Sequence, residues 1–314
     1  MTNTYASLAY SQAYGKMAQN STSSIVYVDE LQTWICVRNI PGTIYKDAVG
    51  PYPFTSISCP ESKETLKNFL NEHDIISLVL VTDPLNQAIN ADATWLMDIF
   101  DMAPVYKEHY AVNLNKIDTT EIATAFSKHH RYEVRKANKI CETRLISLAD
   151  YMDQWCRLYK HLVDRHQLQG IHCFSREYFE AIAKMPEFVS IASFISGQMT
   201  SCNIWLHNEG NVYNHLGASN TQGYSNNTSY AVYAHAIQHF SDCQAIDLGG
   251  APDTVSGQRN LSFFKKGFSN QTNINRICGI IVNPKRYASL CDQFDIDPKQ
   301  TTFFPAYRTT AKNI

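Results

Sequence analysis

Three short apolar segments separated by turn residues constrain the fold of this chain more than any other feature. They comprise residues 188–195, 200–206 and 211–217. Gly197 separates the first two, and Asn208-Glu209-Gly210 separates the last two. Both sequences are typical of the turns that join hairpin strands. The sequence therefore predicts three consecutive antiparallel strands.

A helix and a further strand follow these three segments. Asn227-Thr228-Ser229 offers side chains that cap a helix, and an apolar stripe runs on to Phe240. Residues 245–248 are apolar and have the length of a strand, and they lead into Gly249-Gly250. We expect the helix start near Asn227 and the strand end near Asp247 to lie at the same edge of the sheet.

The stretch 247–270, DLGGAPDTVSGQRNLSFFKKGFSN, is the strongest candidate for a functional site. A strand end that breaks at glycines lets a ligand approach the backbone closely. Asp247, Arg259, Lys265 and Lys266 bring a carboxylate and three cations to this segment. The alternative is a surface turn with solvated lysines.

The N-terminal part of the chain reads as a separate α/β unit. We expect a loose arm or a short helix over residues 1–24, and a break between two units near residue 116. Strands are predicted at 25–28, 33–40, 75–81 and 105–114, and helices at 62–71 and 93–100. The run IISLVLV at 75–81 is apolar throughout, which is typical of a strand covered on both faces.

The second unit begins with a basic helix. Asp118-Thr119-Thr120-Glu121 resembles a helix start, and Arg131, Arg135 and Lys139 follow at four-residue spacing on one helical face. Such a stripe can hold phosphate or a carboxylated acceptor, and the alternative is a solvated face. Ser147 and Asp150 resemble a capping box that starts an amphipathic helix reaching Leu162.

Charge and hydropathy exclude several classes of protein. The 314 residues carry a formal net charge of −2, which gives no general attraction to DNA or to an anionic membrane. No segment approaches the roughly 20 apolar residues that span a bilayer, and the first residues do not resemble a signal peptide. The nine cysteines are scattered and never form C-x-x-C, which favours reduced thiols. We therefore expect a soluble, cytoplasmic protein.

His129-His130 is the one motif that suggests a metal. No carboxylate or cysteine lies at ligand spacing on the same helical face, and Arg131 would repel a cation. We expect no metal site.

Four segments of the second unit resemble the GNAT acyltransferase superfamily and, within it, the Fem-like branch. They are KHHRYEVRKA (128–137), VYNHLGASN (212–220), SYAVYAHAIQHF (229–240) and the pair IDLGGAPD and FFKKGFSN (246–270). The last pair is the most specific, and the first 115 residues match more weakly. The resemblance implies an α/β (α+β) fold of tandem GNAT-like lobes, 1–115 and 116–314. Each lobe would be a mixed, mainly antiparallel sheet flanked by helices.

Membership of this superfamily implies transfer of an acyl or aminoacyl group to an amine, without metal or covalent intermediate. An activated donor leaves the protein to align the amine, remove its proton and stabilise an oxyanion. The helix start at 223–229 is suited to phosphate or pantetheine groups. Two features depart from the family: the pyrophosphate loop survives at best as Gln222-Gly223-Tyr224-Ser225, and the long coiled-coil insertion is missing.

These departures bear on the donor and the acceptor. Loss of the pyrophosphate loop argues against tight binding of free acetyl-CoA. Loss of the insertion argues against a lipid-linked muropeptide acceptor or an aminoacyl-tRNA donor. We expect an N-acyltransferase that moves an acyl group, including a long-chain one, to an amine of a small molecule or peptide. Acyl-CoA or an acyl carrier protein would be the co-substrate, and no cofactor would be tightly bound.

The resemblance also nominates site residues. The candidate catalytic residues are His215, Asp247 and Lys265. Those expected to bind substrate or acyl donor are Tyr213, Ser219, Asn220, Asn227, Ser229, Arg259 and Arg135. His215 has the ordinary pKa of a general base, although a structural histidine is an alternative. Asp247 could instead cap the glycine turn, and Arg259 could pair with Asp253.

Two other functions remain open. The stripe of Arg131, Arg135 and Lys139 is compatible with an aminoacyl-tRNA-dependent transferase of the Fem type. A non-catalytic GNAT-like module that binds a peptide or carrier protein is the third hypothesis.

Overall fold

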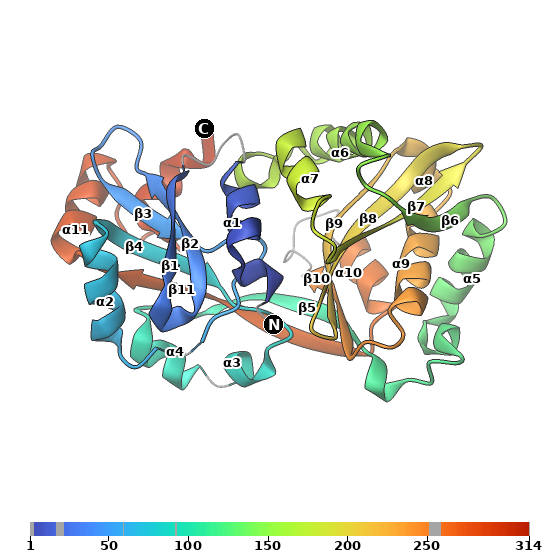
Figure 1. Ribbon diagram of the computed structural model, residues 1–314, viewed down its shortest axis with the longest axis horizontal. Helices are drawn as coiled ribbons and strands as arrows, with labels where there is room; N and C mark the ends of the chain where they lie inside the picture. Colours follow the sequence, from blue (N-terminus) through green and yellow to red (C-terminus); the bar gives the residue numbers. More distant parts are fainter. Residues whose placement is uncertain (1–2, 17–21, 59, 92, 251–258, 314) are drawn as a thin grey trace. The chain divides into compact units, whose positions relative to one another are not determined.

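The computed structural model describes residues 3–16, 22–58, 60–91, 93–250 and 259–313. The chain forms two compact units (Figure 1). Unit 1 comprises Met1–Tyr106, Gly170–Tyr178 and Asn275–Ile314, and unit 2 comprises Lys107–Gln169 and Phe179–Ile274. This division differs from the predicted one at residue 115, because the last forty or so residues return to unit 1 rather than closing the second lobe.

Unit 1 contains a five-stranded sheet in the order β1-β2-β3-β4-β11. Its strands are β1 (Thr22–Val28), β2 (Thr33–Asn39), β3 (Lys46–Val49), β4 (Ile75–Val81) and most of β11 (Gln271–Ile281). Its helices are α1 (Leu8–Gly15), α2 (Lys63–Glu72), α3 (Gln87–Ala91), α4 (Thr94–Ile99) and α11 (Pro284–Gln293), with 3-10 turns η1 (Thr4–Ala6), η2 (Asp29–Leu31), η5 (Gly170–His172) and η6 (Ala306–Asn313). All strand pairs are antiparallel except β3 with β4.

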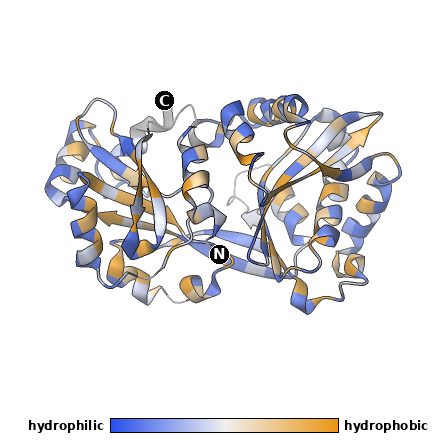
Figure 2. Ribbon diagram, viewed as in Figure 1, coloured by the Kyte–Doolittle hydropathy of each residue, from blue (hydrophilic) through white to orange (hydrophobic). Residues whose placement is uncertain are grey.

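The strand predicted at 75–81 is confirmed as β4, and nearly all of it is buried. It pairs with β3 on one side and with β11 on the other, and its apolar side chains contribute to the main core of unit 1. Hydrophobic residues accordingly mark the central strands in Figure 2. Ser62 caps α2 through the Thr65 amide, and Leu66 and Leu70 face the core.

The N-terminal segment adopts the helical alternative. Ser7 caps α1, which buries Tyr10 and Tyr14. The Tyr10 hydroxyl bonds to the Tyr52 carbonyl, and its ring meets that of Tyr178 edge-on. Burial of these rings, rather than branched aliphatic residues, holds the segment in place.

Unit 2 contains a six-stranded sheet in the order β5-β10-β9-β8-β7-β6. Its strands are β5 (Val105–Asn113), β6 (Glu142–Ile146), β7 (Phe188–Ile195), β8 (Gln198–Asn208), β9 (Asn211–Ser219) and β10 (Ala245–Gly250). Its helices are α5 (Lys128–Ala137), α6 (Met152–His166), most of α7 (Arg176–Ile182), α8 (Thr221–Ser225), α9 (Thr228–His239) and α10 (Arg259–Lys266), with η3 (Leu114–Lys116) and η4 (Ile122–Ala125). The one parallel pair among these described strands joins β9 to β10.

The predicted antiparallel meander is confirmed as β7, β8 and β9. Helix α9 packs on β7 and β8, and α6 packs on β8 and β9 (Figure 1). The core between α9 and the sheet includes Trp205, Val232, Ile237 and Ile246. The mixed, mostly antiparallel α/β fold is therefore present as expected.

The predicted starts of two helices, α5 and α6, are wrong. The basic helix begins at Lys128, capped by Ser127, and not after residue 121. Asp118 instead closes a turn through the Thr120 amide, and extended backbone at Phe126 separates η4 from α5. Ser147 likewise closes a turn before α6 begins at Met152.

Several elements were not predicted. The segment 259–266 is helix α10, which was not predicted, and neither was strand β3. The described part of the chain contains no helix with the length and apolarity needed to cross a bilayer. The eight cysteines within the described ranges are free thiols.

Candidate functional site

The parallel strands β9 and β10 stop pairing part-way along their length. Three residue pairs join them, and the last is between Tyr213 and Asp247. Beyond it β9 continues to Ser219 and β10 continues to Gly250, without a further backbone pair between these described residues. Separated strands leave main-chain groups that need other partners, which a ligand can supply. The candidate site lies at this separation.

Two β-bulges accompany the separation. In β9, His215 is the extra residue where the register against β8 shifts. In β10, the register against β5 shifts between Asp247 and Gly250, and Gly249 between them has a φ of +89°. A bulge bends its strand and increases the local twist. The two strands therefore diverge just where the predicted site residues begin.

Asp247 is the centre of a buried polar cluster. Its carboxylate is 1% exposed, accepts a hydrogen bond from the Gly249 amide at 3.1 Å, and lies 3.0 Å from Nδ1 of His109. Lys265, from α10, donates from Nζ to the Gly250 carbonyl at 2.7 Å. The structure thus brings two of the three predicted catalytic residues together, and adds a histidine from β5.

The two glycines allow these side chains to approach the end of β10. A Cβ at Gly249 would lie 2.8 Å from Nζ of Lys265, and one at Gly250 would lie 3.1 Å from Nε2 of His109. The positive φ of Gly249 is also a conformation that other residues rarely adopt. The absence of side chains at Gly249 and Gly250 therefore leaves room for Lys265 and His109 beside the backbone of β10.

The amine of Lys265 can change protonation near neutral pH. Burial lowers its pKa to about 8, against the opposing attraction of Asp247, and Lys107 lowers it further. Burial disfavours the charged form of an amine because it loses hydration. Lys265 can therefore act as a hydrogen-bond donor below this pH and as a base above it.

His215 is a poorer candidate for the general base than the sequence indicated. It is buried in β9, its ring packs edge-on against Phe188 at 5.2 Å, and burial lowers its pKa to about 3. A base of that strength is far from the pH at which amine transfer is useful. The structural alternative for His215 is the better interpretation.

A chain of amides joins the strands beneath the separation. Asn203 donates to the side-chain oxygen of Asn214 at 3.0 Å, and the Asn214 amide bonds to the Tyr233 hydroxyl and lies 3.5 Å from the Leu248 carbonyl. Burial raises the pKa of Tyr233, so its hydroxyl stays protonated. This chain connects β8, β9, α9 and β10, and the sequence analysis did not identify it.

The predicted donor-binding serines are brought together by the start of α9. Ser219 lies 2.9 Å from Ser229 and 2.7 Å from Ser201, and Ser201 lies 2.6 Å from Thr228, in each case between hydroxyl oxygens. Hydroxyl groups both donate and accept, so this cluster can adapt to a polar ligand. Ser219 and Ser229, both predicted to bind the donor, are thus part of one hydroxyl cluster.

The two predicted asparagines have structural partners. Asn220 caps α8 by accepting from the Gly223 amide at 2.9 Å. Asn227 has a φ of 54°, and its Nδ2 donates to Oε2 of the buried Glu133 at 2.8 Å. A carboxylate beside the first turn of α9 is favoured by the helix dipole, and it repels a second anion. Glu133 thus brings a carboxylate to the residue before α9, where donor phosphate was predicted.

The remaining predicted residues do not contribute side chains to the cluster, or their side chains lie outside the described part of the chain. Tyr213 is buried in the last β9–β10 pair. Arg135 is exposed on α5. Arg259 is the first residue of α10, but its side chain and all of Asp253 lie outside the described part of the chain.

The adjacent histidines have a packing role. Both ring nitrogens of His130 are engaged, with the Ser127 hydroxyl and the Phe264 carbonyl, each at 2.8 Å. A Cβ at Gly267 would overlap the His130 ring, so this glycine is required for the contact. His130 therefore fastens α5 to α10. No group of possible metal ligands occurs among the described residues.

His109 is the functional candidate that the sequence analysis missed. It stands in the alternating stretch 105–114, which predicts a strand but not its neighbour. Only the antiparallel pairing of β5 with β10 places His109 beside Asp247, 138 residues away. The one feature of the sequence that could have identified His109 as a site residue is its place on the inward-facing side of a predicted strand.

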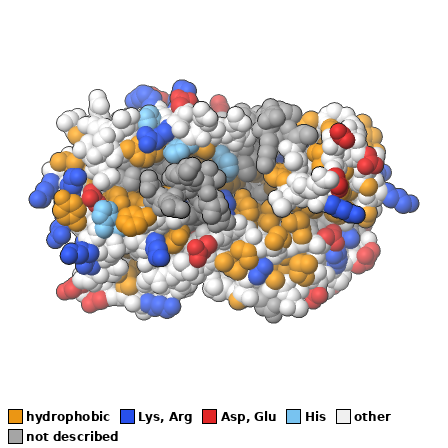
Figure 3. Space-filling view, turned by 180° about the vertical axis from the view of Figure 1, so that it is seen from behind, with side chains coloured by type: hydrophobic (Ala, Val, Ile, Leu, Met, Phe, Trp, Pro, Cys, Tyr) orange, Lys and Arg blue, Asp and Glu red, His pale blue; other side chains and the backbone are white. Residues whose placement is uncertain are grey.

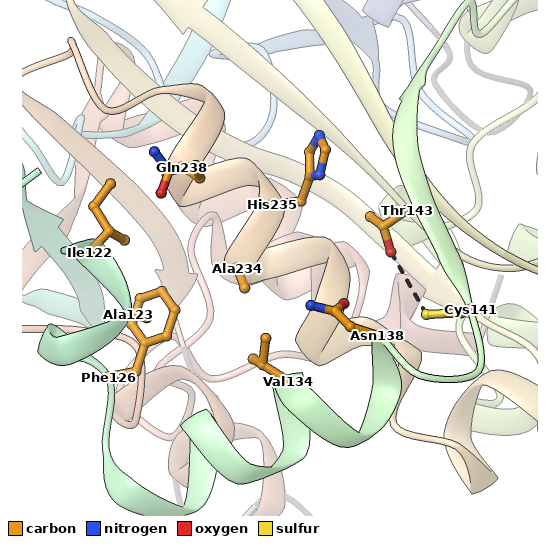
Figure 4. A pocket seen from close by; sticks show the side chains of 10 residues that line it. All are labelled: Ile122, Ala123, Phe126, Val134, Asn138, Cys141, Thr143, Ala234, His235 and Gln238. Carbon is orange, nitrogen blue, oxygen red and sulfur yellow. Dashed lines mark hydrogen bonds between the residues drawn. The ribbon is translucent and has the colours of Figure 1, made fainter. Parts of the chain in front are cut away.

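A separate pocket of about 410 Å³ lies in unit 2 beside α5 and α9 (Figure 4). Ile122, Phe126, Val134 and Ala234 supply much of its apolar wall, and polar groups such as Gln238 also border it. None of the predicted site residues lines it. The pocket and the separation of β9 from β10 are different features.

Comparison with solved structures supports the fold assignment. The crystal structure of FemX superposes with a TM-score of 0.60 at 12% identity, covering 82% of this chain and 86% of that one. The C-terminal domain of a putative lysylphosphatidylglycerol synthetase from Agrobacterium fabrum gives 0.58 at 13% identity, covering 90% of each chain. L-PGS from Bacillus licheniformis gives 0.56 at 10% identity, with 89% and 93% covered.

The chain has a Fem-like fold. Identities this low establish the architecture and not the activity. No protein-family model matches the sequence, and no curated protein matches it significantly. The fold that the resemblance implied is therefore confirmed, while the chemistry has to be argued from the site.

Proposed function

We propose that this protein is an N-acyltransferase, which moves an acyl group from a thioester to the amine of a small molecule or peptide. The observation that carries the proposal is the buried cluster of Asp247, His109 and Lys265 at the separation of two parallel strands. Buried ionisable groups at a strand end are costly for stability, and they are typical of functional sites.

The cluster supplies the groups that the reaction needs. The acceptor amine attacks the thioester carbonyl carbon, a C–N bond forms, the C–S bond breaks, and the thiol leaves with a proton that the amine gave up. Asp247 accepts from Nδ1–H of His109, which leaves Nε2 of that ring without a described partner and able to take the proton. As an ammonium, Lys265 has further N–H groups that can stabilise the carbonyl oxygen as it becomes negative.

The carboxylate of Glu133 bears on the donor. Because it lies beside the first turn of α9, that turn is a poor site for a nucleotide pyrophosphate. This supports a donor whose acyl group is presented without a free pyrophosphate, such as a thioester on a carrier protein. Acyl-CoA is the competing donor, and no tightly bound cofactor is proposed.

Aminoacyl transfer is the second candidate. Its support is the fold shared with FemX and with lysylphosphatidylglycerol synthetases, together with exposed cations on α5. An aminoacyl-tRNA donor would make activity sensitive to ribonuclease. A carrier-protein or CoA thioester would not.

The decisive experiment is intact-mass analysis of amine acceptors incubated with the protein and a panel of acyl thioesters. Once a product is found, we expect Asp247→Asn and Lys265→Ala each to lower kcat/KM at least tenfold, which corresponds to about 1.4 kcal/mol of transition-state stabilisation. The cause would be loss of the oriented histidine in one variant and of the oxyanion donor in the other.

Asp150→Asn and Lys266→Ala are the matched controls, because both side chains are exposed and carry the same charges. Circular dichroism checks that each variant is folded. Unchanged kinetics in both cluster variants would refute this site. Absence of product with every thioester, but ribonuclease-sensitive transfer from aminoacyl-tRNA, would favour the second candidate.

A further inference from the structure

The exposed face of α5 carries a continuous stripe of basic and aromatic side chains. Lys128, Tyr132, Arg135 and Lys139 recur at spacings of four, three and four residues, and all four are exposed. Lys128, Tyr132 and Arg135 lie on one line along α5, and Lys139 follows in the turn after the helix ends at Ala137. We call these four residues the α5 stripe.

The stripe differs from the one that the sequence predicted. Arg131, which was assigned to it, donates from Nη1 to the carbonyls of Thr124 and Phe126 and is only half-exposed. Its guanidinium therefore closes the end of η4. Lys128 and Tyr132 take its place, and the stripe extends from the first residue of α5 to the turn beyond its end.

Charge on this face is unbalanced. Lys136 adds a fourth exposed cation, whereas Glu133, the one acidic residue of α5, is buried against Asn227. Figure 3 shows Lys and Arg side chains gathered near hydrophobic ones where α5 lies, at the left of that view. On a protein with a net charge of −2, such a local excess attracts an acidic partner.

Apolar surface accompanies the charge. Tyr132 is 56% exposed, and Phe263 of α10 is 55% exposed and packs against His129 with ring centroids 5.4 Å apart. Along the other flank of α5, Val134 and Asn138 border the pocket of about 410 Å³ (Figure 4). Apolar surface beside charged side chains is typical of a protein–protein interface.

The donor end of the candidate site is close to this surface. Glu133 is on the buried side of α5 and bonds to Asn227, which precedes the first turn of α9. The stripe therefore lies about one helix diameter, roughly 10 Å, from that turn. A partner seated on α5 can deliver a flexible thioester arm to the Ser219–Ser229 hydroxyls.

We propose that the α5 stripe and the adjacent pocket dock an acidic helix of the carrier protein that brings the acyl thioester. The stripe supplies the cations, and the pocket takes an apolar side chain of the partner. This inference rests on the proposed acyl transfer and names its donor. A protein helix fits better than nucleic acid because the basic face is only one ten-residue helix long and is interleaved with apolar surface.

The test measures binding of an apo acyl carrier protein by isothermal titration calorimetry, so no catalysis is needed. We expect the triple variant Lys128→Glu, Arg135→Glu, Lys139→Glu to weaken binding at least tenfold. Binding by the unmodified protein should also weaken as salt is raised. The matched control is Arg157→Glu, Lys160→Glu, Lys184→Glu, which reverses three exposed cations elsewhere in unit 2 and should bind normally.

A second variant tests the pocket. Asn138→Trp places a large side chain at its exposed rim without altering the core, and we expect it to weaken carrier binding while thermal stability is retained. Transfer from a small thioester such as acyl-pantetheine should be unchanged in Asn138→Trp and in the double variant Lys128→Glu, Lys139→Glu. Loss of that transfer would count against the docking role, because it would place the stripe in the catalytic site.

Two outcomes overturn the proposal. One is equal carrier binding by the unmodified protein and the stripe variant, or none by either. The other is stripe-dependent binding of bulk tRNA or of phosphatidylglycerol vesicles that exceeds carrier binding. Failure of the proposed function is distinct, because it appears as absence of transfer from every thioester, whatever the carrier does.

Discussion

Two histidines in unit 2 illustrate how neighbours decide the role of a side chain. His215 packs against Phe188, and burial lowers its pKa to about 3. His109 is equally buried, but it has the carboxylate of Asp247 within hydrogen-bonding distance. Burial therefore keeps the imidazole of His215 neutral, whereas the carboxylate of Asp247 fixes the orientation of the His109 ring.

Lys265 should make the free energy of unfolding depend on pH. Its pKa is about 8 in the folded protein against 10.5 ordinarily, so the unfolded chain binds more protons between these values. The contribution of Lys265 to stability therefore rises with pH across this window, by roughly 3 kcal/mol in all. In urea unfolding, we expect the free energy of unfolding of the wild type to rise relative to that of Lys265→Met between pH 8 and 10.5. Lys266→Met, at an exposed position, should show no such trend.

At the scale of elements, the end of β10 is shaped by its contact with α10. Gly249 has a φ of +89°, and a Cβ at this position would lie 2.8 Å from Nζ of Lys265. Gly197, in the β7–β8 turn, has a φ of +79° and nothing within 4 Å of such an atom. A substitution at Gly197 therefore introduces backbone strain alone, whereas one at Gly249 introduces backbone strain and a steric clash.

We expect Gly197→Ala to lower the free energy of unfolding by about 1 kcal/mol through backbone strain alone. Gly249→Ala should cost more than this, because the methyl group also displaces the Lys265 ammonium, and it should reduce acyl transfer. Chemical denaturation and kinetics of both variants test the idea. Equal stabilities and equal rates would show that the Lys265 contact contributes nothing.

At the scale of the molecule, the C-terminal segment is fastened into unit 1 by a buried ionic network. Asp47 on β3 is fully buried and pairs with Arg38 at 3.0 Å and with Arg308 of η6 at 2.9 Å. Tyr307 donates to the same carboxylate at 3.2 Å and lies 2.8 Å from the Ser77 hydroxyl. Because two cations share this one carboxylate, we expect the stability of unit 1 to depend strongly on Asp47.

Replacing Asp47 by Asn should lower the free energy of unfolding by about 3–5 kcal/mol, because it leaves two largely buried guanidinium groups without their counter-charge. Asp164→Asn removes an exposed ion pair with Lys160, and we expect a change below about 1 kcal/mol. Thermal or urea unfolding of both variants provides the comparison. A small effect at Asp47 would mean that η6 does not depend on this network.

Local sequence was sufficient for most strands and for the order of the second unit. The apolar run of β4, the hairpin turns of the meander and the stripe of α9 are recorded in neighbouring residues, so periodicity reveals them. Helix starts were less predictable, because Ser127 and Asp118 both offer caps, and the structure uses only Ser127 to start α5, after extended backbone at Phe126.

The sequence by itself determined the fold class, the meander and the glycine break after Asp247, because these depend on spacing and turn chemistry. Only the tertiary structure decided which residues meet there. His109 reaches Asp247 through strand pairing, Lys265 through the packing of α10, and Glu133 through the packing of α5 on α9. The division of the chain was decided in the same way, because β11 pairs with β4 across nearly two hundred residues of sequence. Such contacts join distant segments, and no local pattern encodes them.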